Sequence, residues 1–482
     1  MAIYRTNNPQ EYDLVDGIVI DERAAAPDIQ GVQTNVVLIL GQFQRGPADI
    51  VNVGSTKQFY KEYGNDSSYL GHISLLNKKF GTLKLRRVIA ADAALASLIL
   101  VDGSSDPVAT LSAKNKGVYG NSIKITVDPD APNKKITITD TDPKVQILPE
   151  IFLGVTALNI AEKLASSELV NVSAVDDTKS LIDLVLTPLA GGSDGTIIDT
   201  DYEAALLDSQ EELVANIVMM DEYNATRNLY LKTHSSNTQD RMCIMGGPVT
   251  ETVTAVETAA ALLRDTDGRL IYSYNWIETL VDGVLVYTSP ASWIASIMSQ
   301  TGTHVDPAYA GNTKYLSGAV RVKQKLGRAE FIRLMNAGVC SFENDADTGI
   351  KLKSGVTTQI ADSSKLTILR RRMADWYTNS IGIFFKLYQN DINSEEKRTA
   401  VKGAILRFDN TYSQGAQKIL PSDNEVKAGK ALLIDVETLN DDQSIGQGKF
   451  FIKIKRRIYS SMRFIVLIAE IGETVVVTES EE

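Results

Sequence analysis

The sequence has few of the residues that most enzymes use for acid–base and metal chemistry. Its only histidines are His72, His234 and His304, and none lies in a protease signature or at metal-ligand spacing from another. His72 falls in the polar part of an expected helix, His234 at a helix end and His304 in a loop, so we expect all three at the surface. Neither an HExxH nor a DxDxD pattern occurs. The sequence therefore predicts no catalytic residue, no metal site and no cofactor.

Cysteine is equally scarce. Cys243 and Cys340 are far apart, lack the CxxC spacing of a metal or redox site, and each has apolar neighbours in the sequence. We expect two buried thiols without a chemical role.

Long apolar runs, a secretion signal and a basic excess are also missing. The longest apolar runs, such as residues 36–40, fall far short of the ~18 residues that a membrane helix needs. The first residues lack the basic start and apolar stretch of a signal peptide, so we expect the chain to be assembled in the cytoplasm. The net charge of −11 argues against a general nucleic-acid binder, although residues 370–372 and 453–457 are basic.

What the chain does have is a strongly β-prone C-terminal end. Ile452 and Ile454 alternate with Lys453 and Lys455, the pattern of a half-buried strand. Residues 464–469 are apolar without interruption, as in a strand covered on both faces. We expect these residues to form the core of a sheet, with Phe464, Val466 and Ile468 as its receiving strand.

Both chain ends carry an isolated β-prone run. One follows Gly472 with no turn to fold it back, and the other precedes the Ala-Ala-Ala-Pro27 break. A strand without a partner of its own lies at an edge or adds to another molecule's sheet. The candidate inter-subunit strands are Ile18, Val19 and Ile20 at the N-terminal end and Val475, Val476 and Val477 at the C-terminal end.

The first part of the chain begins in an α/β pattern. Residues 34–41 read as a buried strand, Ser55 begins a helix that Gly64 ends, and a second helix at 69–80 precedes a strand at 83–90. From 94 to 192 the pattern changes to short strands, expected at 123–127, 134–139, 145–148 and 181–186, with one helix at 157–166. We expect a small β-rich domain inserted into the first unit.

Residues 193–363 alternate between strand and helix, which predicts a parallel sheet with helices on its faces. The expected strands are 214–220, 242–245, 270–274, 284–287 and 339–342, and the expected helices are 225–233, 253–264, 291–298 and 329–337. The glycine-rich residues 191–195 that precede this part lack the Gly-Lys-Ser/Thr ending of a nucleotide loop, so we interpret them as a flexible interdomain hinge.

The last part contains two long helices, expected at 366–387 and 395–412, and a strand at 431–437. Because the C-terminal sheet needs helical cover and the N-terminal unit is short, we expect both ends to form one discontinuous α/β domain. The fold class is thus multidomain α/β with mixed α+β character. The expected boundaries are 1–23 for the N-terminal arm, 24–93 plus 364–472 for the discontinuous domain, 94–192 for the β-rich insertion, 193–363 for the third domain, and 473–482 for the C-terminal arm.

The basic run in the first long helix has two interpretations. Arg370, Arg371 and Arg372 cover most of a helical turn just before Trp376. They could form a solvated basic face or a docking face for an acidic protein surface, since the guanidinium fork suits carboxylates.

Several short motifs, in order along nearly the whole chain, resemble those of contractile bacteriophage tail sheath proteins and of sheaths in related contractile injection particles. Residues 15–22 resemble the family's N-terminal arm, 31–47 its first core strand, and 59–64 its Phe-x-x-x-Phe-Gly helix end. The further matching segments are Arg86-Arg87-Val88, Gly117-Val118-Tyr119-Gly120-Asn121, where tyrosine replaces the family's tryptophan, and Gly191-Gly192-Ser193-Asp194-Gly195.

The resemblance implies a subunit that polymerises as stacked hexameric rings around an inner tube and contracts to drive the tube through the bacterial envelope. It implies a third domain with a subtilisin-like fold but no activity, exchange of the terminal strands between subunits, and Arg370, Arg371 and Arg372 as tube-facing candidates. The implied partners are further copies of the chain, the tail tube protein, and baseplate and tail terminator proteins, with no nucleic acid or membrane. The implied location is the virion tail, after assembly in the host cytoplasm.

From this we expect the 94–192 and 193–363 domains to decorate the outside of the polymer and to be dispensable for its assembly. The alternative function is an α/β hydrolase with an accessory β domain, for which Ser289 and Ser292 are the nearest candidates for a nucleophile. They lack a histidine signature, so we expect no enzyme activity.

Overall fold

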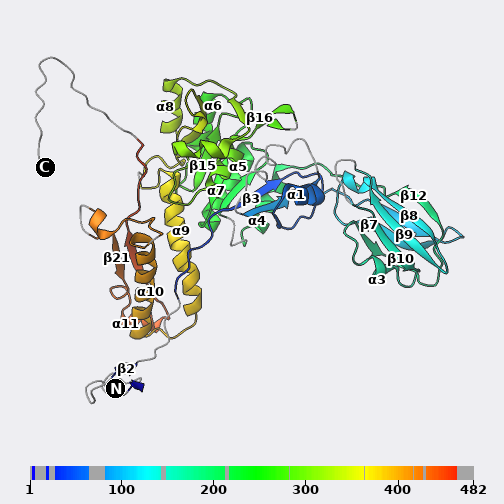
Figure 1. The fold of residues 1–482 in the computed structure, drawn as a ribbon, viewed down its shortest axis with the longest axis horizontal. Helices are drawn as coiled ribbons and strands as arrows, with labels where there is room; N and C mark the ends of the chain where they lie inside the picture. Colours follow the sequence, from blue (N-terminus) through cyan, green and yellow to red (C-terminus); the bar gives the residue numbers. More distant parts are fainter. Residues whose placement is uncertain are drawn as a thin grey trace, which may run out of the picture.

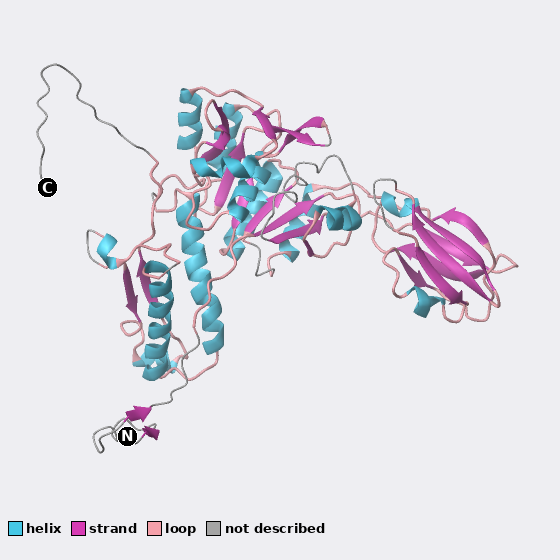
Figure 2. Cartoon of the chain, in the orientation of Figure 1, coloured by secondary structure: helices cyan, strands magenta, loops and turns pink. Residues whose placement is uncertain are grey.

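The chain folds into a central α/β body with a β-rich domain on one side and a helical unit on the other (Figures 1 and 2). The computed structural model describes residues 3–5, 18–20, 28–64, 82–142, 148–211, 216–281, 283–362, 364–415, 417–426 and 430–463. The expected helix at 69–80 lies outside these ranges.

An eight-stranded sheet forms the central body, in the order β20-β19-β15-β14-β13-β3-β5-β4. Its six inner strands are parallel, and β4 and β20 pair antiparallel at the two edges. The parallel sheet predicted for the third domain is therefore confirmed for four of its five expected strands. The strand expected at 284–287 is instead β17 (Val284–Thr288), which belongs to a separate antiparallel sheet. The strands are β3 (Val36–Gly41), β4 (Val51–Val53), β5 (Thr82–Arg87), β13 (Ile217–Met220), β14 (Met242–Met245), β15 (Leu270–Tyr274), β19 (Val339–Asp345) and β20 (Gly349–Leu352).

Helices follow these strands close to the predicted positions. Ser55 caps the first helix by accepting a hydrogen bond from Gln58 N, and Gly64 ends it with φ 81°, as the sequence predicts. The helices are α1 (Thr56–Tyr63), α4 (Asp199–Asp208), α5 (Ala225–Thr238), α6 (Val253–Leu262), α7 (Pro290–Gln300) and α8 (Arg328–Asn336). A small antiparallel sheet, β17-β16-β18, extends from this body and contains β16 (Ile277–Val281), β17 (Val284–Thr288) and β18 (Ala319–Val322).

The N-terminal strands belong to the central sheet, which corrects the pairing expected for residues 24–93 with 364–472. Every residue of β3 is buried, and β3 pairs with β5 on one side and with β13 on the other. A strand buried on both faces needs neighbours on both edges, and β13 supplies the second one. The segment before β3 contacts the C-terminal unit, where Val32 N donates to Ser380 Oγ at 3.0 Å.

Residues 94–192 form a β-rich domain with its own hydrophobic core, as expected. One sheet has the order β10-β9-β8-β12 and the other β11-β7-β6. The strands expected at 123–127 and 134–139 are present, the one at 181–186 lies slightly later, and the one at 145–148 falls almost wholly outside the described residues. The elements are β6 (Ser97–Val101), β7 (Pro107–Ala113), η3 (Val118–Ser122), β8 (Ile123–Asp130), β9 (Asn133–Asp140), β10 (Glu150–Val155), α3 (Ile160–Leu164), β11 (Val170–Ser173) and β12 (Leu184–Pro188).

Two long helices and a two-stranded ribbon form the C-terminal unit. The helices are α9 (Ile368–Phe385) and α10 (Glu395–Ser413), and the ribbon pairs β21 (Leu432–Asp435) with β22 (Lys453–Arg456). Both long helices are confirmed. The Trp376 ring of α9 lies 5.5 Å from Phe408 and 4.8 Å from Tyr412 of α10, measured between ring centroids. Aromatic packing therefore joins the two helices into one core.

Candidate functional site

Helix α9 is the element through which the C-terminal unit is fixed to the central body. Its N-cap is Thr367, whose side chain accepts a hydrogen bond from Arg370 N. The three consecutive arginines that follow are about 100° apart around the helix, so they point in different directions. Their surroundings decide which of them a partner could reach.

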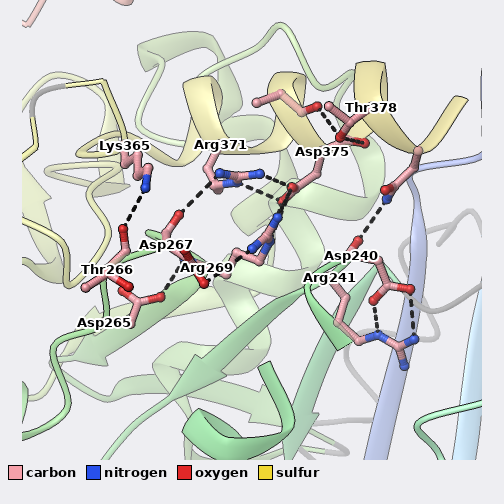
Figure 3. Close-up of polar contacts among 12 residues, drawn as sticks. Asp240, Arg241, Asp265, Thr266, Asp267, Arg269, Lys365, Arg371, Asp375 and Thr378 are labelled. Carbon is pink, nitrogen blue, oxygen red and sulfur yellow. Dashed lines mark hydrogen bonds and ion pairs between the residues drawn. The ribbon is translucent and has the colours of Figure 1, made fainter. Parts of the chain in front are cut away.

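Arg371 lies in a cluster of charges between α9 and the sheet (Figure 3). It forms an ion pair with Asp375 one turn later, and Arg269, the residue before β15, donates to the same carboxylate, with its Nη2 2.8 Å from Asp375 Oδ1. Asp375 is 5% exposed and Arg269 is 8% exposed. One buried carboxylate therefore joins two cations, one from each body of the molecule.

Arg372 points the other way and is buried. Its Nη2 donates to Met298 O at 2.6 Å and to Thr301 O at 3.2 Å. These carbonyls lie at the C-terminal end of α7, where the helix dipole favours a cation. Burial lowers the pKa of Arg372 to about 10, and no carboxylate pairs with it among the described residues. Arg372 is thus a cap for α7 that holds α9 in place.

Of the three tube-facing candidates, Arg372 is only 5% exposed, and Arg371 has its partner inside the subunit. Arg370 is half-buried and stays a candidate. The sequence pattern could not show this, because Arg269 lies 106 residues from Asp375 along the chain.

The β21–β22 ribbon covers α9 and α10 with one face and leaves the other in solvent. Ile452 and Ile454 are half-buried against the helical core, whereas Lys453 and Lys455 are exposed, which confirms the predicted alternation. Neither outer edge of the ribbon pairs with a further strand among the described residues. Unpaired edges are where an additional strand can bind.

The predicted arms are only partly described. Residues 18–20 form the strand β2, which pairs in parallel with β1 (Ile3–Arg5) of the same chain. Val475, Val476 and Val477 lie outside the described residues, and so do Phe464, Val466 and Ile468. Their exchange between subunits remains a prediction.

Two glycine-rich segments meet where the β-rich domain joins the central body. Asn121 Nδ2 donates to Gly192 O at 3.0 Å, and Asn121 Oδ1 accepts from Gly192 N at 2.9 Å. Asp194 Oδ1 accepts from Val118 N at 3.1 Å and pairs with Arg87 at 3.3 Å. Residues 191–195 do connect the two domains, but these bonds fix them in place, unlike the flexible hinge that we expected.

Two buried arginines reinforce this joint. Arg87 is 4% exposed and donates to Phe43 O at 2.8 Å and Lys116 O at 2.6 Å, so it bonds to both domains. Arg45 pairs with Asp140 of the β-rich domain at 2.6 Å. The Arg-Val motif indicated a strand at this position, but it gave no sign of Arg87's bonds to the second domain.

Replacing Gly192 with alanine is expected to loosen this joint. The added Cβ would lie 2.5 Å from Gly117 O and 3.0 Å from Ala96 Cβ, so the backbone must shift. Overpacking of this kind typically costs about 1 to 3 kcal/mol. Urea unfolding of Gly192→Ala should show that loss. The matched control is Gly103→Ala, where nothing lies within 4 Å, and an equal loss in both variants would contradict the interpretation.

The histidines and cysteines have different surroundings from one another. His234 is 1% exposed, so its predicted surface position is wrong; burial and the nearby Arg241 lower its pKa to about 4. His304 is exposed, as expected, and His72 is outside the described residues. Cys243 and Cys340 are buried free thiols, which confirms the prediction. Over the described residues we find no group of three or more His, Cys, Asp and Glu side chains arranged to hold a metal ion.

The hydrolase candidates have no support in the geometry. Ser292 is fully buried in α7, and its Oγ donates to Ser289 O at 2.7 Å. A nucleophile needs an accessible hydroxyl beside a base. Within the described ranges, no helix is both long enough and apolar enough to cross a membrane.

Comparison with known proteins finds similarity to the kind of protein that the motifs resemble. No family model matches the chain. A "Putative tail sheath protein" of Enterococcus phage phiEF24C is 27% identical over 226 residues, which cover 46% of this chain and 38% of that protein. The match thus spans well under half of the relative's length.

Solved structures of similar fold cover nearly the whole chain. The sheath tail protein of Listeria innocua has a TM-score of 0.65 at 16% identity, over 89% of this chain and 96% of that one. The contracted helical sheath of the anti-feeding prophage has a TM-score of 0.59 at 15% identity, over 95% of this chain and 99% of that one. The resemblance to contractile tail sheath proteins is therefore confirmed, and at these identities the solved structures establish a shared mixed α/β fold.

Proposed function

We propose that the chain is the structural subunit of a contractile tail sheath, without catalytic activity. In this proposal it polymerises as stacked hexameric rings around an inner tube, and contraction drives the tube through the bacterial envelope to deliver a genome. The observation that carries the proposal is the fold, which matches a helical sheath over 95% of the chain. The partners are further copies of the chain, the tube protein, and baseplate and terminator proteins of the virion tail.

The C-terminal ribbon supports a mode of assembly by strand addition. A two-stranded sheet is marginally stable alone, and β21–β22 has both edges open among the described residues. A donated strand would add main-chain hydrogen bonds that persist while a flexible connector bends, so neighbours stay linked as their bodies rotate. We propose the ribbon as the receiving sheet, Val475 to Val477 as one donor, and Ile18 to Ile20 as the second, after β2 leaves β1.

The surface that faces the tube is proposed to be basic. Lys453, Lys455 and Arg457 are exposed on the outer face of the ribbon, and Arg370 is half-buried on α9. Such a surface suits an acidic partner. The boundaries expected for the two arms and for the β-rich insertion remain proposals. In place of 24–93 plus 364–472, we propose residues 28–35 and 364–463 as the inner unit, because β3 and β5 belong to the central sheet.

Electron microscopy of the purified full-length chain tests the proposal. Helical tubes are expected, because the open strand edges favour head-to-tail addition. Removing residues 473–482, or replacing Val476 with proline, should leave a folded monomer by size-exclusion chromatography, since proline deletes a ladder donor. If the full-length chain forms only globules, the sheath assignment fails; if the shortened chain still forms tubes, strand donation from the C-terminal end is wrong.

A further inference from the structure

Two adjoining cavities form a groove between the central body and the C-terminal unit. The larger has a volume of about 640 Å³ and the smaller one of about 520 Å³. They share His304, from the loop that follows α7, and Lys418 and Ile419 of the C-terminal unit, so they are neighbouring parts of one groove. Residues 459–463, which follow β22, complete the wall of the larger cavity.

The walls of the larger cavity are rich in apolar side chains. Val305, Leu369 and Ile419 line it, and so does Tyr309, which is 63% exposed. Met462 also lines it and is 87% exposed, so the groove opens to solvent. Exposed apolar surface gathered around a groove marks a place that another segment of protein covers.

The charges around the same cavity are balanced. Arg463 and Asp306 add one charge of each sign to its lining. Both lysines of the lining already form ion pairs of 2.9 Å inside the subunit, Lys353 with Glu343 and Lys418 with Glu425. A charged partner would lose water here without gaining an opposite charge, so the groove favours an apolar occupant.

The chain supplies such an occupant at the groove itself. Arg463 lines the larger cavity, and the next six residues, 464–469, are Phe-Ile-Val-Leu-Ile-Ala. These six lie outside the described residues. Extended, six residues span about 20 Å. Because they are tethered directly to the wall, their local concentration at the groove is about millimolar, an advantage that no segment of another molecule has.

The free subunit also needs cover for this segment. An uncharged apolar run of six residues without proline is an aggregation hazard when it is exposed. A neighbouring subunit can cover it only after assembly. Before that, the groove beside Arg463 is apolar cover within reach of residues 464–469.

We propose that in the free subunit residues 464–469 fold back into this groove of their own chain. This role differs from the receiving strand that the sequence suggested for Phe464, Val466 and Ile468. The fold-back keeps the subunit monomeric, because the C-terminal end is held against its own body until the ribbon of a neighbour takes it up. That release rests on the proposed function, whereas the fold-back itself does not.

Crosslinking of the full chain tests the fold-back directly. Tyr309→Cys on the groove wall is combined with Ile465→Cys, and a short reducible bismaleimide is added at a concentration where the chain elutes as a monomer. The native thiols should not interfere, since Cys243 and Cys340 are buried and burial raises the pKa of both to about 12. The expected result is a link within one chain, seen by mass spectrometry.

The matched control combines Ile465→Cys with Leu158→Cys in the β-rich domain, where the leucine is 75% exposed. The groove pair should link at least tenfold faster than this control pair. Val466→Cys replaces Ile465→Cys in a second set, in case the first substitution itself loosens the segment. Equal rates for the groove and control pairs in both sets would overturn the proposal, and so would links between chains, which would make a second copy the occupant.

The release step is tested on the same linked chain. It should form no tubes, and cleaving the linker with a reductant should restore them, whereas the chain carrying the control pair should form tubes throughout. If the unmodified chain forms no tubes, the proposed function fails while the crosslinking result still decides the fold-back. Tubes from the linked chain would show that residues 464–469 do not need to leave the groove.

Discussion

Replacing Asp375 with alanine is expected to lower the free energy of unfolding by about 3 to 5 kcal/mol, because it leaves the buried Arg269 with only the longer, 3.7 Å ion pair to Asp267 among the described residues. Asp375 is the carboxylate that Arg269 and Arg371 share, and Arg269 is only 8% exposed. Without it the sheet and α9 present two positive charges to each other across their interface. Guanidinium unfolding monitored by tryptophan fluorescence measures the loss, since Trp376 is the next residue on the helix.

Two comparisons test whether the burial of the ion pair causes the expected loss of stability. Asp28→Ala removes an ion pair of similar length, 2.9 Å to Arg407, but both of those side chains are more than half exposed. It should cost at most about 1 kcal/mol. The triple variant Arg269→Met, Arg371→Met and Asp375→Leu removes the carboxylate together with both of its cations and should recover most of the loss. If Asp375→Ala cost no more than Asp28→Ala, the cluster would not be what fixes α9 to the sheet.

Excising the β-rich domain is expected to leave a folded body. Ala94 N donates to Ser193 O at 2.9 Å and Ser193 N donates to Ala94 O at 3.2 Å, so the two chain crossings lie side by side. A two-glycine linker from Ala94 to Ser193 can close this pair as a hairpin. Arg45 should be changed to methionine in the same variant, because its partner Asp140 leaves with the domain. A cooperative thermal transition and a monomer-sized elution are the expected results.

The larger excision, which joins residue 93 to residue 364, should fail to fold. It was expected from the sequence to assemble, but it removes β13 to β20 and leaves one edge of the buried strand β3 without its neighbour. Circular dichroism and protease resistance of the two variants, measured side by side, distinguish the outcomes. A folded 93-to-364 variant would show that β3 and β5 can find other partners.

Local sequence patterns predicted the positions of helices and strands well, but they did not predict which strands pair with one another. Strands β14 and β15 were predicted at their observed residues, because both are short apolar runs between helices with clear caps. The same kind of run at 36–41 carries no information about which distant strand will pair with it, and β13 lies about 180 residues further along.

The burial of polar side chains was the second feature that the sequence did not predict. Arg372 and His234 have the polarity of surface residues, and only tertiary contacts determine that one caps α7 and that the other is enclosed beside Arg241. The Gly191 to Gly195 segment has the composition of a linker, yet the carboxylate of Asp194 and the amide of Asn121 fix it. The composition of the segment indicates that it would be flexible by itself, but its contacts with neighbouring residues hold it in one conformation.

The position of β3 in the middle of the sheet has a consequence for synthesis on the ribosome. Its neighbour β5 emerges about 45 residues later, but β13 emerges only after the whole β-rich domain. At about 5 to 20 residues per second, the interval between β3 and β13 is roughly 10 to 40 s. During that time an entirely apolar strand has one edge unpaired, while the domain encoded between them can already fold. The nascent chain is therefore exposed to aggregation for as long as this interval lasts. A chaperone would have its largest effect on folding during the same interval.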